Sequence, residues 1–294
     1  MTERLSDVEA RIGTVHQLSA VITAMRGVAA ARAREAQNRL DGIQAYAQTI
    51  ATAIGQALAF LPPAMRPDAA PAGGDPRGSH LIIALCAEQG FAGAFSQHVL
   101  TAAQRLQQAS PHGSALLLIG DRGQMVATEW GLTVAWSAAM VAHVEQVAAL
   151  ANRVVEALYD RLEGGKVARV TLVHALPGAT AVLEIVEKQL VPFDFGRFPL
   201  SRNAVTPLIT LSPQLLLTRL VEEYVFAELC EAVTLSFAAE SEARMRAMIA
   251  ARSNVAAKLD SLTSQARQLR QEAITGEIIE LASGATASEG GGFR

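Results

Sequence analysis

Aromatic residues, cysteines and long apolar runs are scarce in this sequence. Only 5% of its 294 residues are aromatic although 50% are hydrophobic, so aliphatic side chains supply the apolar surface. That composition favours helices over an all-β sandwich. No apolar run reaches the roughly 18 residues of a membrane span, and the N-terminus lacks the apolar core of a signal peptide. We therefore expect a helix-rich protein that is soluble, or that meets a membrane only through a partner.

The net charge bears on the class of partner, and the cysteine content bears on the redox compartment. The formal net charge of -3 provides no overall basic field, which argues against a nucleic-acid-binding protein. The two cysteines, Cys86 and Cys230, lie in apolar runs and are too few for a disulfide framework. We expect both thiols to be buried and the chain to work in a reducing compartment.

Motifs for catalysis, cofactors and metals are missing. The loop EQGFAGAF at 88–95 lies where a phosphate-binding loop would, between a predicted strand and a predicted helix, but it matches neither G-x-G-x-x-G nor G-x-x-x-x-G-K-[ST]. It predicts a tight turn built from small residues. The six histidines show no H-x-x-x-H spacing, and there is no G-x-S-x-G elbow. We expect no cofactor, no metal and no catalytic residue, which leaves the central domain as a scaffold.

Proline and glycine divide the chain. Residues 6–60 contain no proline, and 62–78 then form a Pro/Gly-rich break. A second proline-free stretch follows Ser212-Pro213, where serine can cap a helix and proline can occupy its first position. The predicted segments are a coiled-coil helix at 1–61, a linker at 62–78, an α/β domain at 79–210, a coiled-coil helix at 211–283 and a flexible tail at 284–294.

The first helix carries a heptad seam. Small or apolar residues recur in alternating steps of four and three from Val8 to Leu61, and only Ser19 and Arg26 interrupt them. This spacing is typical of a left-handed coiled coil. Two long helices at opposite ends of one chain can pair only as an antiparallel intramolecular coiled coil. The seam is Val8, Ile12, Val15, Ser19, Ile22, Arg26, Ala29, Ala33, Ala36, Leu40, Ile43, Ala47, Ile50, Ile54, Ala57 and Leu61.

The middle of the chain alternates short β-rich runs with helical stretches. This alternation predicts a parallel, Rossmann-like α/β sheet. The turn LPGAT between the last two runs suits an antiparallel hairpin. The predicted strands are 80–86, 115–120, 132–136, 169–175 and 181–191, and the predicted helices lie around 94–108, 121–129 and 141–163.

Basic residues gather on both terminal helices of a chain that is acidic overall. They form either ordinary solvated helix faces or a collar that faces an acidic partner, and the sequence leaves both readings open. The residues concerned are Arg26, Arg32, Arg34, Arg39, Arg244, Arg246, Arg252, Lys258, Arg267 and Arg270.

Three sequence blocks resemble the gamma subunit of F-type rotary ATP synthases. VITAMRGVAAARAREAQ (21–37) resembles the family's K-I-T-K-A-M-x-M-V-A-A-x-K, and EARMRAMIAARSN (242–254) its A-A-R-M-x-A-M-x-A-A-x-x-N. RQEAITGEIIELASGATA (270–287) resembles R-Q-A-x-I-T-x-E-L-x-E-I-x-x-G-A. The chain departs from the family around its first strand, where Glu88 and Gln89 replace Asp-Arg, and at Arg267, which points to a divergent branch.

The resemblance implies a central rotor stalk with no catalytic site of its own. It also implies that the stalk couples ion flow to ATP synthesis or hydrolysis. The implied partners are the alpha and beta subunits of the catalytic hexamer, the epsilon subunit and the membrane c-ring, on the cytoplasmic face of the inner membrane. By the same resemblance, Met25 beside Arg244, Gln271 and Thr275 is expected to form one coupling cluster where the two long helices cross. We add Arg26 and Arg270 as candidates for contact with acidic loops of the beta subunit. A non-rotary coiled-coil adaptor is the alternative, and an enzyme built on the α/β domain is a third and weaker hypothesis.

Overall fold

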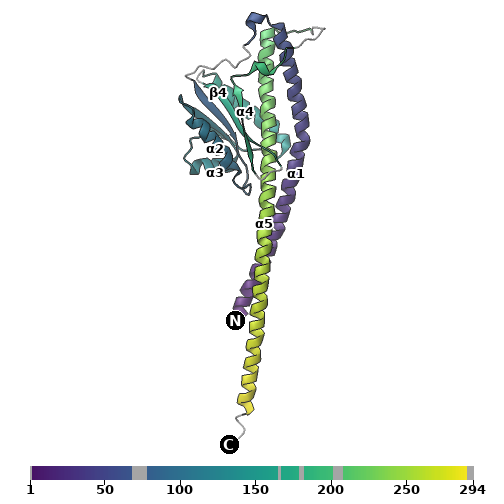
Figure 1. Cartoon of the computed structure of the whole chain (residues 1–294), viewed down its shortest axis with the longest axis vertical. Helices are drawn as coiled ribbons and strands as arrows, with labels where there is room; N and C mark the ends of the chain where they lie inside the picture. Colours follow the sequence, from purple (N-terminus) through teal and green to yellow (C-terminus); the bar gives the residue numbers. More distant parts are fainter. Residues whose placement is uncertain (1, 68–77, 165–166, 179–181, 201–207, 290–294) are drawn as a thin grey trace. The chain divides into compact units, whose positions relative to one another are not determined.

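The computed structural model describes residues 2–67, 78–164, 167–178, 182–200 and 208–289 (Figure 1). Its contacts divide the chain into two units, Ala29–Arg244 and a second unit formed by Met1–Val28 with Met245–Arg294. Both units contain parts of the two long helices, α1 (Thr2–Phe60) and α5 (Pro213–Glu289).

A capping serine and a proline mark the beginning of α5. The hydroxyl of Ser212 accepts a hydrogen bond from Leu215 N (3.4 Å), and Pro213 is the first residue of α5, as the sequence predicts. Helix α5 continues to Glu289, past the expected end at 283. In the expected linker, a short 3-10 helix, η1, spans Pro63–Met65, while residues 68–77 and 290–294 lie outside the described residues.

A five-stranded sheet forms the middle of the unit Ala29–Arg244, with the strand order β3-β2-β1-β4-β5. The first four strands are parallel, and β5 pairs antiparallel with β4, so both the parallel sheet and the terminal hairpin are confirmed. The strands are β1 (Ser79–Leu85), β2 (Ser114–Ile119), β3 (Trp136–Ala138), β4 (Val167–Leu176) and β5 (Glu184–Val191).

The third strand begins later than the sequence predicts. Residue Gly131 adopts a positive φ of 66° after α3, and Leu132 N donates to Ala127 O at 2.9 Å, which caps that helix. Residues 132–135 therefore serve as the cap and the connection, and the strand starts at Trp136 instead of 132. The remaining helices are α2 (Phe95–Gln108), α3 (Asp121–Glu129), α4 (Val147–Leu162), η2 (Val144–Gln146) and η3 (Phe195–Arg197).

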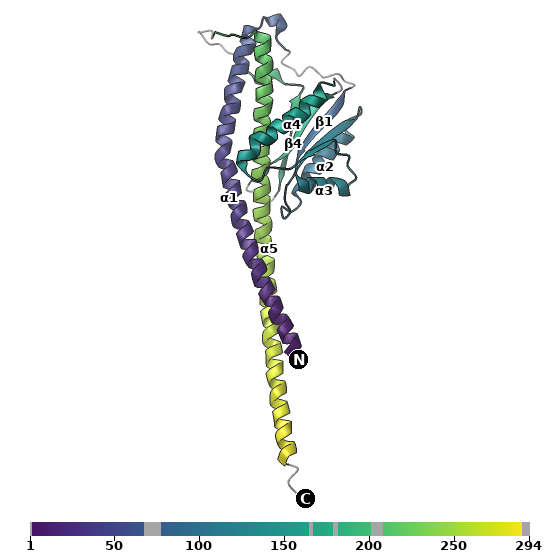
Figure 2. The ribbon, with the colours of Figure 1, turned by 180° about the vertical axis from the view of Figure 1, so that it is seen from behind.

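Helices cover both faces of the sheet because alternate strand residues point to opposite sides. Leu81 and Ile83 of β1 pack in a core with α4 and α5. Ile82 and Ala84, on the other face, pack in a core with α2 and α3. Figure 2 shows α4 on the sheet face that it shares with α5. The part of α5 that packs in the first of these cores therefore belongs structurally to the α/β unit.

The seam of α1 is buried as its periodicity predicts. Every one of the predicted seam positions is buried or half-buried. In the unit Ala29–Arg244, Ala29, Ala33 and Ala36 are between 1% and 6% exposed. Hydrogen bonds from Gln37 to Glu242 (3.4 Å) and from Gln44 to Glu231 (2.9 Å) show that α1 and α5 run antiparallel there.

An aromatic cluster closes one end of this unit. Phe193, Phe198 and Tyr224 pack with their ring centroids 5.0 to 5.8 Å apart, against Ile54 and other apolar residues of α1. A Cβ at Gly55 would lie 2.4 Å from the carbonyl oxygen of Pro199, so only glycine permits this close approach.

The second unit is a pair of helical segments with a thin core. Val8 of α1 is buried with Leu262 and Ala266 of α5, and Leu5, Ile12, Val15 and Leu269 are packed beside them. Arg270 Nη2 lies 2.6 Å from Glu9 Oε1, which fixes an antiparallel register there as well. The antiparallel coiled coil is confirmed separately in each unit.

Candidate functional site

The second unit, Met1–Val28 with Met245–Arg294, consists of segments of the two long helices and is called the helical unit. Three of the expected contact residues lie on the exposed surface of α5 in this unit. Arg270 forms its ion pair with Glu9, and both side chains are about half exposed or more, at 64% and 49%. Gln271 and Thr275 are also exposed, one turn apart, and Thr275 Oγ1 donates to Gln271 O at 2.8 Å. A partner can therefore reach all three side chains.

Met25 and Arg26 lie elsewhere in the same unit. Both are half-buried on α1. The pairing of Glu9 with Arg270 places Gln271 and Thr275 level with the beginning of α1. Met25 follows Glu9 by 16 residues, a separation of about 24 Å along the helix. Met25 therefore does not join Gln271 and Thr275 in one packed cluster, contrary to our expectation, because the helix register separates them.

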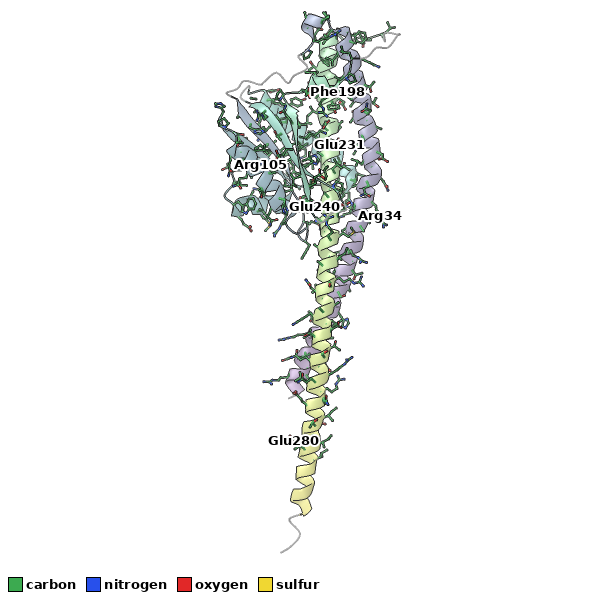
Figure 3. The ribbon with its side chains drawn as sticks, viewed as in Figure 1. Arg34, Arg105, Phe198, Glu231, Glu240 and Glu280 are labelled. Carbon is green, nitrogen blue, oxygen red and sulfur yellow. The ribbon has the colours of Figure 1, made fainter. Side chains whose placement is uncertain are left out.

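Most basic side chains of the long helices face outward. Arg34 and Arg39 on α1 are exposed, as Figure 3 shows for Arg34, and Arg252, Lys258 and Arg267 on α5 are exposed as well. Arg39 Nη2 lies 3.5 Å from Glu145 Oε1, with both side chains more than half exposed. Exposed pairs of this kind contribute only about 0 to 1 kcal/mol.

Arg244 is buried, unlike the other expected contact residues. Its side chain is 6% exposed and forms an ion pair with Glu240, one turn earlier in α5. Arg244 Nε donates to Gly90 O and Nη2 donates to Gln89 O, both at 3.2 Å. Burial raises the pKa of Glu240, and the nearby Arg244 guanidinium opposes that rise. Arg244 therefore binds the loop after β1 to α5.

Glu88 extends this network across the sheet. Its backbone N donates to Glu240 Oε2 at 3.4 Å. Its own carboxylate accepts hydrogen bonds from Asp121 N (3.2 Å), at the N-terminus of α3, and from Met140 N (2.7 Å), after β3. The departure from the family pattern at Glu88 thus occupies a site where a carboxylate satisfies two backbone donors.

The same loop holds Phe91 in an uncommon conformation. Phe91 has a φ of 63° and is 68% exposed. A bulky side chain in the left-handed region costs of order 1–3 kcal/mol, and such a conformation persists only where the surroundings hold it. The hydrogen bonds from Arg244 to the two preceding carbonyl groups provide that support.

A second buried charge cluster lies nearer the beginning of α5. Glu228, which is 3% exposed, forms ion pairs with Lys188 on β5 and with Arg197 Nη2 of η3, the latter at 3.3 Å. Glu231 Oε2 also lies 3.5 Å from Lys188 Nζ. Burial lowers the pKa of Lys188, and the Glu231 carboxylate opposes that change.

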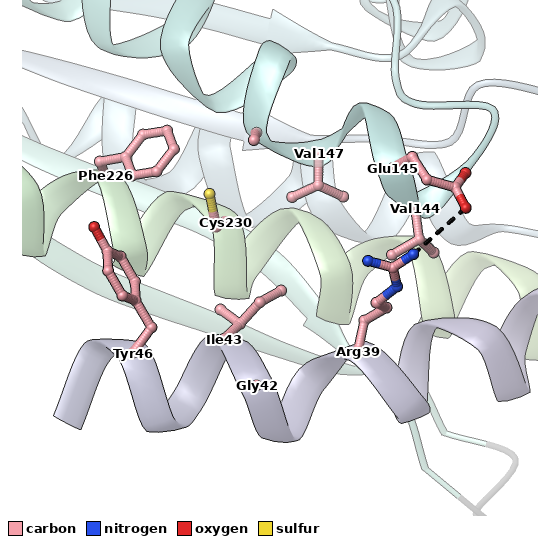
Figure 4. A pocket seen from close by; sticks show the side chains of 10 residues that line it. Arg39, Gly42, Ile43, Tyr46, Val144, Glu145, Val147, Phe226 and Cys230 are labelled. Atoms are coloured by element: carbon pink, nitrogen blue, oxygen red, sulfur yellow. Dashed lines mark ion pairs between the residues drawn. The ribbon is translucent and has the colours of Figure 1, made fainter. Parts of the chain in front are cut away.

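An open groove of about 370 Å³ is lined by α1, η2, α4 and α5 (Figure 4). Arg39, Tyr46, Phe226 and Cys230 are among its lining residues. Burial raises the pKa of Cys230 to about 11, so this thiol is a poor nucleophile at neutral pH. Both cysteines are buried and unpaired, as expected.

The described residues contain no group of three or more His, Cys, Asp or Glu side chains able to hold a metal ion. Among the helices that the structure describes, none has the length and apolar character needed to span a bilayer.

The sequence pointed to Arg244 but not to its contacts. Glu240 lies four residues before Arg244, a spacing at which side chains meet on one helix face, and this signal was available. Lys188 and Glu228 are 40 residues apart in different elements. Only the packing of β5 on α5 brings these two together.

Comparisons with known proteins agree over nearly the whole length. A family model described as ATP synthase matches residues 4–287. The "ATP synthase gamma chain" of Paracoccus denitrificans is 30% identical, with 96% of this chain and 99% of the relative covered. The protein of the same name from Solibacter usitatus is 29% identical, with 97% and 99% covered.

A solved structure shares the fold. A chain in the Euglena gracilis mitochondrial ATP synthase, in a structure described as OSCP/F1/c-ring in rotational state 3, matches with a TM-score of 0.67. The match covers 99% of this chain and 96% of that one at 11% identity, so it supports the fold alone.

Proposed function

Because the chain belongs to the family of ATP synthase gamma chains, we propose that it is the central rotor stalk of an F-type ATP synthase. The observation that carries this proposal is that the α/β domain is bound to α5 by the ion pair of Lys188 with the buried Glu228 and by hydrogen bonds from Arg244 to the loop after β1. Helix α5 is one of two long helices that pair antiparallel in each unit. This architecture lets one chain connect a membrane rotor at the domain to a catalytic ring around the helices.

In this proposal, the chain couples ion flow through the c-ring to ATP synthesis or hydrolysis in the hexamer of alpha and beta subunits. The epsilon subunit is a further partner. ATP binding and cleavage take place on the partner subunits, and this chain supplies no catalytic residue and no cofactor. It lies at the cytoplasmic face of the inner membrane and meets the membrane through the c-ring.

The helix seam suits a shaft that must turn inside a ring. Ala29, Ala33 and Ala36 bury little area each but let α1 approach α5 closely in the unit Ala29–Arg244. The charged side chains outside the seam are mostly exposed. Contacts that they make with a surrounding ring are individually weak, so each can break and reform as the shaft turns. Differences among these contacts couple the shaft angle to nucleotide affinity.

The expected coupling residues then have two kinds of role. Exposed Gln271 and Thr275, together with half-buried Met25 and Arg26, are proposed to contact the catalytic ring directly. Arg270 contacts the ring while it also pairs with Glu9. The buried Arg244 acts indirectly, through the loop that it holds.

Reconstitution with alpha and beta subunits tests this function. We expect the three to co-purify as a complex that hydrolyses ATP and, on c-ring-containing membranes, pumps ions. Failure to assemble with either subunit would contradict the proposal. Assembly without ion pumping would instead favour a non-rotary coiled-coil adaptor, which neither the family model nor the relatives support.

A further inference from the structure

Helix α5 carries fully buried charges where it faces the α/β domain. Within the unit Ala29–Arg244, Glu228, Glu240 and Arg244 are only 3% to 5% exposed. Removing charges from water is expensive, and apolar residues of similar volume often stabilise a fold as well or better. Stability alone therefore does not account for these buried charges.

The charges form two separate clamps. The first clamp consists of Glu228 with Lys188 and Arg197 and joins α5 to the β5 side of the sheet. The second clamp consists of Glu240 and Arg244 with the loop carbonyls that follow β1. Glu228 and Arg244 are 16 residues apart, which places the clamps about 24 Å apart along α5. Figure 3 shows Glu231 and Glu240 on the stretch of α5 that lies beside the sheet.

The contacts between the clamps are mainly apolar. Leu229, Val233 and Phe237 are buried in the core that α5 shares with the sheet and α4. Ser236 Oγ donates to Leu85 O at 3.2 Å, a polar contact between the two clamps. Close-packed apolar side chains resist large rotations of the helix. The clamps add hydrogen-bonded contacts at two levels of α5, and hydrogen bonds weaken steeply when donor and acceptor move out of line.

We propose that the two clamps form a torsional lock, which stops α5 from turning about its own axis against the α/β domain. This inference rests on the proposed function, because only a rotor must transmit torque across this junction. Glu228, Lys188, Glu240 and Arg244 are positioning residues that keep the domain and the helix at a fixed angle. The second clamp also holds the loop that carries Phe91.

The test neutralises each clamp in the assembled, membrane-bound complex. Glu240→Gln with Arg244→Met opens the second clamp without leaving an unpaired buried charge. Lys188→Met with Glu228→Gln opens the first clamp and leaves two partly exposed charges, Arg197, which still donates to Tyr224, and Glu231, which still accepts from Gln44. The matched control is Arg219→Met with Glu222→Gln, which removes an exposed Arg-Glu pair of the same helix. The readouts are ATP hydrolysis, ions pumped per ATP, and hydrogen exchange of the amides at 86–93.

For both clamp variants we expect hydrolysis to continue while the ions pumped per ATP fall about threefold, within the range of mutational effects on long-range coupling. The control should pump as the unmodified complex does. Hydrogen exchange of the amides at 86–93 should become faster in the second-clamp variant only. Arg244→Lys, which keeps the charge but loses the planar fork, should restore part of the pumping.

Normal pumping per ATP in a clamp variant whose loop exchanges faster would overturn the lock and leave the rotor function intact. If the double variant of the second clamp does not assemble, Arg244→Lys replaces it, because pumping equal to the unmodified complex despite faster exchange at 86–93 would also contradict the lock. Loss of assembly in the unmodified chain would contradict the rotor function itself.

Discussion

Helix α5 is largely buried in one unit of the chain and largely exposed to solvent in the other. In the unit Ala29–Arg244, every residue from Tyr224 to Arg244 is buried or half-buried. In the other unit, only Leu262 and Ala266 are buried between Ile249 and Leu281. A pair of helices can bury only a narrow stripe, whereas a sheet and a further helix enclose the whole circumference.

One stretch of α5 therefore stabilises the fold, while the other is accessible to partner proteins. The buried stretch of α5 holds a domain in place, and its charges are used inside the fold. The stretch in the helical unit exposes Ile274, Ile278 and Ile279, each more than half accessible. Its surface remains open to partners, and its own core contributes little to stability.

Truncating one buried leucine in each unit should give the largest contrast. Leu229→Ala removes a fully buried side chain from the core beside the sheet, where we expect a loss of about 2–5 kcal/mol. Leu262→Ala opens a thin two-helix seam that can close around the gap, so we expect about 2 kcal/mol or less. Urea unfolding of the purified chain measures both, and equal losses would contradict the comparison.

Overpacking the alanine seam should have the next largest effect. Ala33→Phe places a large ring where only 6% of the residue is exposed, and we expect about 1–3 kcal/mol of destabilisation as the helices are forced apart. Ala31→Phe, on the exposed face of the same turn, is the control. An Ala33→Phe complex with unchanged thermal stability and normal ATP-driven pumping would rule out a tight seam.

The ion pair between Arg270 and Glu9 should matter little to folding. Both side chains are exposed, so a double-mutant cycle of Arg270→Ala and Glu9→Ala should give a coupling energy of about 0 to 1 kcal/mol. The two singles and the double variant are compared by thermal unfolding. A coupling energy well above this range would show that the helical unit depends on its surface charges.

The smallest expected effect is a pH dependence confined to the unit Ala29–Arg244. Burial lowers the pKa of His174, and burial together with Arg169 lowers that of His80. The unfolded chain therefore binds protons first as the pH falls through about 6.5, so stability present above that pH is lost below it.

Unfolding at pH 7.5 and pH 5.5 measures this loss. His174→Asn should reduce the difference between the two pH values, whereas His112→Asn, at an exposed site, should leave it unchanged. An unchanged pH dependence in the His174 variant would show that its burial does not control protonation.

The sequence was sufficient for the periodic parts of the fold. The heptad seam, the cap at Ser212 and the alternation of strands and helices depend on local spacing, and each is confirmed. The start of β3 was missed because Gly131 and Leu132 cap the preceding helix, which a count of apolar residues does not reveal.

The site was less predictable because its contacts join distant segments. Arg244 was identified from the family resemblance, but its partners Gln89 and Gly90 are about 150 residues away in sequence. The expected cluster of Met25 with Gln271 and Thr275 does not form because of the register between the two helices. The sequence of one helix alone does not determine that register, whereas a single contact such as the ion pair of Arg270 with Glu9 does.

Observation of single complexes tests the central claim most directly. A probe is attached at Gln108→Cys, an exposed position on α2, while the two native thiols are buried, and the alpha and beta subunits are fixed to a surface. A probe on a rotor stalk should turn continuously in one direction when ATP is added and stop when ATP is removed. ATP hydrolysis by the assembled complex with a stationary probe would contradict the rotor function.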